Sequence, residues 1–234
     1  MMVERRRLLI LASVLGLVSF CAGLYVRTAV VRAPVQPITG RRIAGIATDR
    51  VWLDRPSRER EEAPDQALTL IGIQPGMVVA DVGAGTGYMT VRLAVLVGPG
   101  GKVYANDLQP DMLQAIRTKA QAARLPNIVV VQGTETDSRL PDNAIDLALL
   151  VDVYHEFQHP QEMLRSIQRS LKAHGELVVV EYRKEDPAIP IADTHRMSVA
   201  NLRTEIEAEG FRFDRLATDL LRQHVVVFRK ARLN

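Results

Sequence analysis

Three glycines at alternate positions stand between a short apolar run and a segment of helical pattern. The run, residues 78–82, contains the acid Asp81, and Gly83, Gly85 and Gly87 follow it. Glycine lets the backbone turn sharply and lets a ligand approach the main chain without meeting a Cβ atom. Because a helical pattern begins directly after the loop, the first amides of that helix would face the ligand. The pattern therefore predicts a nucleotide-type site where a strand passes into a helix.

Two classes of cofactor use such a loop, and the spacing of the glycines separates them. The dinucleotide fingerprint is G-x-G-x-x-G, with its third glycine at the place where helix and strand pack closely. Here Tyr88 occupies that position, and the glycine falls one residue earlier, at Gly87. The spacing disfavours a dinucleotide-binding oxidoreductase, which remains an alternative to be separated by binding assays with the two cofactors.

A second carboxylate follows at the distance that nucleotide-binding folds use. The predicted strand 101–107 ends in Asp107, about 20 residues past the glycine loop, where an acid binds ribose hydroxyls. One carboxylate can accept both hydrogen bonds, because it offers two oxygens. Further apolar runs at residues 127–133, 140–152 and 172–181 predict three more strands.

The pattern Asp-x-Gly-x-Gly-x-Gly resembles motif I of the class I S-adenosylmethionine-dependent methyltransferases. The later strand segments resemble those of the same family in the same order, over roughly residues 64–230. The chain departs from the family at Ala173 and His174, where a Pro-Gly pair is usual in the turn before the fifth strand. The resemblance implies S-adenosylmethionine as cofactor. It implies these cofactor-binding residues: Asp81, Gly83, Ala84, Gly85, Gly87, Asp107, Leu108, Thr134, Glu135 and Asp152.

A polar stretch directly after the fourth predicted strand is the candidate catalytic loop. Ligands bind outside the carboxyl ends of parallel strands, and in the resembled family this loop lies between the cofactor's methyl group and the acceptor. We predict His155, Tyr154 and Glu156 as catalytic residues. His155 is the best candidate base for a hydroxyl or acid acceptor, because its unperturbed pKa is near 6.5. The sequence carries no signature of the acceptor, which we expect to be a small molecule.

The same stretch matches the H-E-x-x-H motif of zinc proteases, from His155 to His159. That chemistry requires both imidazoles on one helical face, with the glutamate as general base. Pro160 disfavours the helical conformation at His159, and the preceding residues predict a buried strand. We therefore predict no metal site, although the spacing leaves Glu162, His174 and His195 open as third ligands.

The elements that must position these residues alternate between strand and helix. Five strand–helix alternations predict an α/β fold, a parallel sheet with helices on both faces. The family resemblance implies a Rossmann-like, doubly wound sheet of seven strands, mostly parallel, with an antiparallel C-terminal strand. We assign residues 64–234 to this methyltransferase domain. Residues 49–63, rich in Arg and Glu, precede it. They predict either a cover over the cofactor or a solvated charged helix.

The N-terminus carries an uncharged, mostly apolar run at residues 8–26, preceded by three arginines. As a helix it would be about 28 Å long, enough to cross a hydrocarbon core. We predict residues 1–32 as a membrane anchor, with a cleaved signal sequence as the alternative, and residues 33–48 as a linker. Arginines flank the run on both sides, so its orientation stays open. The supply of S-adenosylmethionine favours a cytoplasmic catalytic domain.

Composition fits one folded domain with an appendage. The 234 residues are 47% hydrophobic and 24% charged, which is ordinary for a globular protein. The net charge is only +3, and much of the basic excess precedes residue 43, so we expect no nucleic-acid partner. Cys21 is the only cysteine, which excludes a disulfide within the chain and a thiolate metal cluster. A catalytically silent cofactor-binding module at the membrane remains the alternative from another class.

Overall fold

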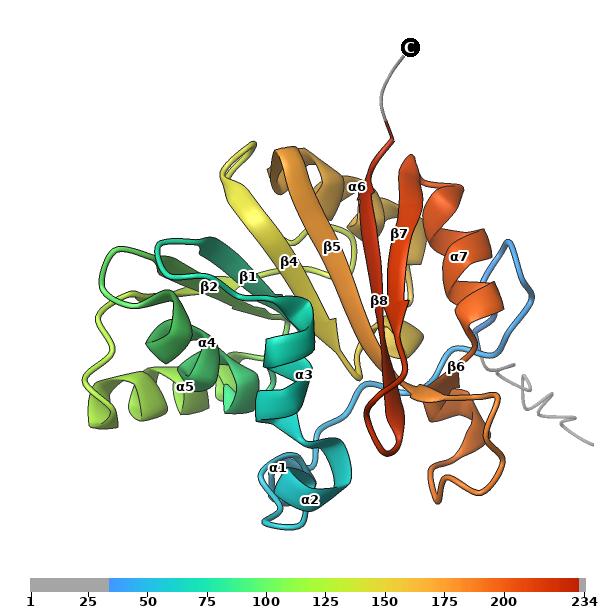
Figure 1. Ribbon diagram of the computed structural model, residues 1–234, viewed down its shortest axis with the longest axis horizontal. Helices are drawn as coiled ribbons and strands as arrows, with labels where there is room; N and C mark the ends of the chain where they lie inside the picture. The colour runs from blue at the N-terminus through green and yellow to red at the C-terminus, as the bar shows by residue number, and fades with distance from the viewer. Residues whose placement is uncertain (1–33, 232–234) are drawn as a thin grey trace, which may run out of the picture. The chain divides into compact units, whose positions relative to one another are not determined.

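A mixed sheet runs through the computed structural model, which describes residues 34–231 (Figure 1). Its strands lie in the order β3-β2-β1-β4-β5-β8-β7, and β6 pairs with β5 beside this path. Strands β1 to β5 are parallel where they pair, and β8 lies antiparallel between β5 and β7. The strands are β1 (Val78–Val82), β2 (Lys102–Asp107), β3 (Ile128–Gln132), β4 (Ile145–Val151), β5 (Leu171–Arg183), β6 (Arg196–Met197), β7 (Phe211–Ala217) and β8 (Gln223–Lys230).

Helices cover both faces of the sheet. The longer helices are α3 (Pro64–Ile71), α4 (Tyr88–Val97), α5 (Pro110–Ala122), α6 (Pro160–Ser170) and α7 (Val199–Glu207). Helices α3, α4 and α5 pack on one face, and α6 and α7 pack on the other. Two short helices, α1 (Arg50–Leu53) and α2 (Arg58–Glu62), and two 3₁₀ turns, η1 (Tyr154–Glu156) and η2 (Asp193–His195), lie near the carboxyl ends of the strands.

The central strands are apolar on both faces because both faces are covered. In β4, Leu147 and Leu149 pack with the helices α3 and α4, while Ala148 and Leu150 pack with α6 and α7. All four side chains are fully or almost fully buried. Strands buried in this way appear in a sequence as continuous apolar runs, which is why the predicted strands agree closely with the observed ones.

Two details of the predicted fold were wrong. The sheet has eight strands rather than seven, because the chain after β5 returns and pairs Arg196 and Met197 with Tyr182 and Arg183. A strand of two residues is too short to leave a periodic signal. The connection from β3 to β4 also contains no helix. Residues in it turn with positive φ, Arg139 at +55° and Asn143 at +49°, so the helical hydrogen-bond pattern cannot continue.

The segment that we predict as a linker makes specific contacts in its described part, residues 34–48. Ile43 and Ala44 are buried, and the Ala44 amide donates to the carbonyl of His155 at 3.0 Å. Arg41 forms a buried ion pair with Glu205 of α7, with Nε and Oε1 2.9 Å apart. The predicted anchor, residues 1–32, lies outside the described residues. Between residues 34 and 231 no helix has both the length and the apolar character needed to cross a membrane.

Candidate functional site

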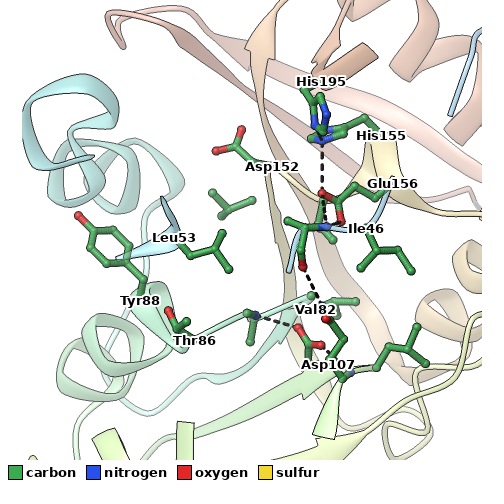
Figure 2. Close-up of a pocket in the computed structure, with 18 of the residues that line it drawn as sticks. Ile46, Leu53, Val82, Thr86, Tyr88, Asp107, Asp152, His155, Glu156 and His195 are labelled. Atoms are coloured by element: carbon green, nitrogen blue, oxygen red, sulfur yellow. Dashed lines mark hydrogen bonds and ion pairs between the residues drawn. The ribbon is translucent and has the colours of Figure 1, made fainter. Parts of the chain in front are cut away.

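A cavity of about 490 Å³ opens at the carboxyl ends of β1, β2, β4 and β5. Its volume lies within the range of about 300–1,000 Å³ that is usual for small-molecule sites. Figure 2 shows Thr86 and Asp107 at one end and His155, Glu156 and His195 at the other. We name the end at the glycine loop the cofactor end and the end at His155 the acceptor end, after the roles that the sequence predicts for them.

The glycine loop is held by main-chain hydrogen bonds. The amides of Gly83 and Ala84 both donate to the carbonyl of Asn106, at 2.8 and 2.9 Å. Gly83 has a φ of +71°, and a Cβ atom there would overlap the side chain of Val153. The close approach of the loop to Val153 therefore requires glycine at this position.

Asp81 lies in β1, two residues before Gly83, and lines the cavity. Its side chain is almost fully buried, and its Oδ2 accepts a hydrogen bond from the Thr90 hydroxyl at 2.6 Å. Burial raises the pKa of Asp81 to about 6. A buried carboxylate with one neutral partner is a strong site for a cationic group of a ligand, since the attraction is little screened by water.

Asp107 ends β2 and braces the glycine loop from the other side. Its Oδ2 accepts from the amide of Gly85 and its Oδ1 from the amide of Gln109, both at 2.8 Å. Burial raises the pKa of Asp107. Leu108, Thr134 and Glu135 line the same end of the cavity. Gly87 does not line it: a Cβ there would lie 3.1 Å from Ile116, so Gly87 serves the packing of α4 against α5.

Asp152 follows β4 in a strained conformation, with a φ of +49°. Its Oδ2 accepts a hydrogen bond from Gln223 of β8 at 2.7 Å, and its buried Oδ1 has no partner among the described residues. Burial, and then the carboxylates of Glu62 and Glu181, raise the pKa of Asp152 well above its usual range. An oxygen without a partner beside the cavity is available to a ligand.

His155 is buried and pairs with the carboxylate of Glu181 at the acceptor end. Its Nδ1 lies 2.6 Å from Oε2 of Glu181, and its Nε2 lies 3.1 Å from Nδ1 of His195. Burial alone would lower the pKa of His155, but the Glu181 carboxylate raises it overall. Burial also raises the pKa of Glu156 to about 7. Since Glu181 fixes one ring nitrogen, the other ring nitrogen of His155 is directed to the acceptor end.

The structure corrects one predicted catalytic residue and separates the pair of the zinc-protease motif. Tyr154 does not line the cavity. Successive side chains of the η1 turn point in different directions. The Tyr154 ring is fully buried in the core, and its centroid lies 5.7 Å from the centroid of the Phe157 ring. His159 is exposed at the start of α6, 3.6 Å from Glu135. His155 and His159 therefore do not form the histidine pair of H-E-x-x-H.

Three residues that contact the site were not among the predicted catalytic or cofactor-binding residues, namely Glu181, His195 and Gln223. Glu181 directly follows an apolar run, Leu177–Val180, and an acid after an apolar run is the same signal that marks Asp81. His195 comes from the long loop after β5 and has no local pattern. Gln223 reaches Asp152 only because β8 pairs antiparallel with β5, with Gln223 opposite Tyr182.

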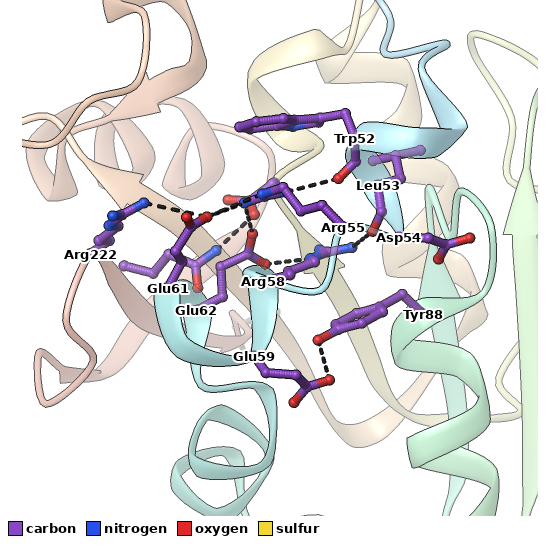
Figure 3. Close-up of polar contacts among 12 residues, drawn as sticks. Trp52, Leu53, Asp54, Arg55, Arg58, Glu59, Glu61, Glu62, Tyr88 and Arg222 are labelled. Carbon is purple, nitrogen blue, oxygen red and sulfur yellow. Dashed lines mark hydrogen bonds and ion pairs between the residues drawn. The ribbon is translucent and has the colours of Figure 1, made fainter.

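The segment 49–63 lies over the glycine loop and is held by buried ion pairs (Figure 3). Glu62 accepts from Arg55 at 2.8 Å, from Arg58 at 2.6 Å and from the Tyr182 hydroxyl at 2.8 Å. The Thr86 hydroxyl of the glycine loop donates to Asp54 at 2.7 Å. The polar network explains why a segment with so many charges packs against the domain, because its charges are paired where they are buried.

The fold and the cavity define a Rossmann-like domain that binds a nucleotide-type cofactor. A family model described as a methyltransferase domain matches residues 73–216, so the chain belongs to this family, within the S-adenosylmethionine-dependent methyltransferases. A structure of an S-adenosylmethionine-dependent methyltransferase from Aquifex aeolicus is 29% identical, with a TM-score of 0.71, and the match covers 76% of this chain and 94% of that one. This match decides against the dinucleotide-binding alternative.

Curated relatives are named ubiquinone/menaquinone biosynthesis C-methyltransferase UbiE. The relative from Ectopseudomonas mendocina is 30% identical over 154 residues, covering 62% of this chain and 59% of the relative. The relative from Shewanella sp. (strain W3-18-1) is 35% identical over 118 residues, covering 50% and 47%. The chain thus spans about three fifths or less of the length of these relatives.

Proposed function

We propose that this chain transfers the methyl group of S-adenosylmethionine to a small-molecule acceptor that binds at the His155 end of the cavity. The observation that carries the proposal is the arrangement of two chemically different ends in one cavity. Asp81, Asp107 and the glycine loop line one end, and His155 with Glu156 lines the other. A cofactor at the first end would present its methyl group toward the second.

The reaction is an in-line displacement at the methyl carbon. A lone pair, or the π electrons at a ring carbon, of the acceptor forms the new bond while the carbon–sulfur bond breaks, and the electron pair of that bond stays on sulfur. A methylated ring carbon then loses its proton to water, which restores the aromatic ring. The positive charge of the sulfonium is dispersed in the transition state, so the protein contributes chiefly by holding the reactants together and aligned. A cavity that joins both ends supplies this alignment.

We propose a quinol-type aromatic ring with hydroxyl groups as the acceptor. The names of the curated relatives suggest this class. The polar groups of His155 and Glu156 suit ring hydroxyls, and the apolar side chains Ile46, Phe157 and Ile191 suit the ring itself. A methyl-transfer assay with a soluble demethylated quinol tests it, and a range of quinols that yields no methylated product would contradict it.

Calorimetric titration of the full chain with S-adenosylmethionine tests the proposed function. We expect micromolar affinity, on the order of −8 kcal/mol. Asp81→Ala and Gly85→Val should each abolish binding, the second because a branched side chain would extend between the loop and Leu53. A folded Gly85→Val protein that binds the cofactor unchanged would contradict the assignment.

His155→Ala separates an enzyme from a catalytically silent cofactor-binding module. His155 lies at the acceptor end, so its removal should reduce methyl transfer and leave the affinity for S-adenosylmethionine within about twofold, well under the tenfold that 1.4 kcal/mol represents. His159→Ala is the control, because this exposed side chain does not line the cavity. A silent module would bind the cofactor in all three proteins and methylate nothing in any of them.

We also propose that residues 1–32 anchor the chain to a membrane. The uncharged run 8–26 supports this proposal. A single charge near the middle of a spanning helix costs about 2.5–3.5 kcal/mol, so the double variant Leu15→Arg, Leu17→Arg should move the full chain from the carbonate-resistant membrane fraction to the supernatant. An unsubstituted chain found only in the supernatant would contradict the anchor.

A further inference from the structure

Three potential metal ligands from two separate segments converge at the acceptor end of the cavity (Figure 2). Nε2 of His155 lies 3.1 Å from Nδ1 of His195 and 3.8 Å from Oε1 of Glu156. The ligand atoms of all three residues lie within 4.8 Å of one another. His155 and Glu156 are buried, and His195 is partly exposed on the cavity side.

We propose that His155, Glu156 and His195 bind one first-row divalent metal ion, such as Zn²⁺, at the acceptor end of the cavity. Two imidazoles and one carboxylate form the donor set of metal sites that keep open positions for water or substrate. With bonds of about 2.0–2.1 Å, adjacent ligand atoms are about 2.9–3.4 Å apart. The observed separation of the two ring nitrogens, 3.1 Å, falls within that range. Oε1 of Glu156 lies 3.8 Å from Nε2 of His155 and would have to move closer to bind the same ion.

The partners of these ligands are those that a metal site requires. The Glu181 carboxylate accepts from Nδ1 of His155, which leaves the lone pair on Nε2, the atom that faces His195 and Glu156. The amide of Ala47 donates to both oxygens of Glu156, at 3.2 and 3.1 Å. Metal-binding histidines almost always have such a carboxylate or carbonyl on their other nitrogen, because it fixes the tautomer and the ring orientation.

The set differs from the H-E-x-x-H motif that the sequence contains. In that motif His159 would be the second ligand, but His159 is exposed and faces Glu135. His195, which lies in the loop after β5 and 40 residues after His155, takes the place of His159. The sequence-based prediction of no metal site considered His195 only as a third ligand beside His159.

The role of the ion rests on the proposed function. An acceptor hydroxyl bound at an open position would lose its proton to water, because the cation stabilises the oxyanion. The electron-rich acceptor would then attack the methyl carbon. In this arrangement Nε2 of His155 is a ligand, so His155 holds the ion rather than taking the proton itself.

Metal analysis of the full chain tests the site without an acceptor. The purified protein is stripped with a chelator, incubated with Zn²⁺ and freed of excess metal, and its zinc content is measured by elemental analysis. We expect about one ion per chain, lost in His155→Ala and in His195→Ala and retained in His159→Ala. Glu181→Gln removes no ligand and should weaken zinc affinity by about 10–100-fold, an effect that a purely structural role of the pair would not produce.

Cofactor titrations of the same proteins separate the two proposals. Zinc content well below one ion per chain in a parent that binds S-adenosylmethionine, or equal zinc in His195→Ala and His159→Ala, would overturn the metal site and leave the proposed function standing. A parent that holds zinc but does not bind S-adenosylmethionine would overturn the proposed function alone. Because His195 is partly exposed on a loop, His195→Ala should stay folded, and thermal unfolding of each variant checks this.

Discussion

The two ends of the cavity are built in different ways. At the cofactor end the glycine loop is held by the carbonyl of Asn106 and the carboxylate of Asp107, so the residues that shape this end lie within two short stretches, 81–87 and 106–109. At the acceptor end, side chains from the η1 turn, from β5 and from the η2 turn meet in space. Their separation along the chain means that only the folded sheet brings them together.

This difference predicts how each end responds to substitution. A loop held through its main-chain amides depends on backbone conformation, so changes of conformation should be as damaging there as the loss of the buried Asp81 carboxylate. A cluster of side chains depends on the identity of each group, so single truncations should alter chemistry while the fold and the cofactor end persist. Four measurements test the cofactor end, from the largest expected effect to the smallest.

The largest effect is expected for Gly83→Ala. The new methyl group would overlap Val153, and the backbone would be held at a φ of +71° that alanine disfavours. Overpacking costs about 1–3 kcal/mol and a left-handed alanine about 1–2 kcal/mol, so we expect the affinity for S-adenosylmethionine to fall by about 100-fold or more. Calorimetry measures it.

Gly72→Ala is the matched control for this substitution. Gly72 has a φ of +84° at the end of α3, but a Cβ there would meet no atom within 4 Å. Because alanine disfavours a positive φ, the Gly72→Ala protein should unfold at a lower temperature than the parent. Its affinity for the cofactor should be unchanged. Equal cofactor affinities for the Gly83 and Gly72 variants would show that the close approach to Val153 is unimportant.

Asp107→Ala should have the next largest effect, about 1.5–3 kcal/mol of cofactor affinity, the usual value of hydrogen bonds to a charged group. The substitution also removes the acceptor for the amide of Gly85. Asp107→Asn keeps one oxygen and should lose less. If both variants and the parent have the same dissociation constant, Asp107 makes no contribution to cofactor binding and is only the last residue of the strand.

Asp81 should make cofactor binding depend on pH. Its pKa is about 6 in the folded protein against an ordinary value of 3.8, so between about pH 4 and 6 the folded state binds more protons than the unfolded state. Stability without ligand therefore falls as the pH rises through this window, by roughly 3 kcal/mol for this group alone. A cationic ligand requires the ionised form, so its affinity should fall about tenfold from pH 7 to pH 5.

Asp81→Asn isolates this group from the other carboxyl groups of the cavity. Asp107, Asp152 and Glu156 have raised pKa values as well and remain in the variant. The comparison is made by titrating both proteins with S-adenosylmethionine at several pH values. A slope that persists unchanged in Asp81→Asn would assign the pH dependence to those other groups.

The sequence was sufficient for the parts of the molecule whose signals are local. It predicted the strand that carries Asp81, the end of β2 at Asp107 and the helical pattern directly after the glycine loop. Each of these has a continuous apolar run, a helical pattern or a glycine loop. The family resemblance added the antiparallel C-terminal strand, which periodicity alone does not determine.

The parts that could not be predicted depend on distant contacts. Gln223 lies beside Asp152 because of the pairing of β5 with β8, and His195 lies beside His155 because a long loop folds back. Tyr154 points into the core because a 3₁₀ turn directs neighbouring side chains apart. In each case the residue type was visible in the sequence, but its direction was decided by packing between elements far apart along the chain.

The smallest effect is expected for Lys119→Ala, which tests whether charge matters at the edge of the cofactor end. Lys119 of α5 pairs with Asp54 at 2.6 Å, and Asp54 also accepts from Thr86 of the glycine loop. Both partners of the ion pair are more than one third exposed, so water and salt screen it, and such pairs contribute about 0.2–1 kcal/mol. The free energy of unfolding, measured with denaturant, should therefore fall by no more than about 1 kcal/mol. The cofactor affinity should change even less. A loss of affinity comparable to that of Asp107→Ala would mean that the ion pair positions the loop and that side-chain charge, rather than the backbone, controls this end of the cavity.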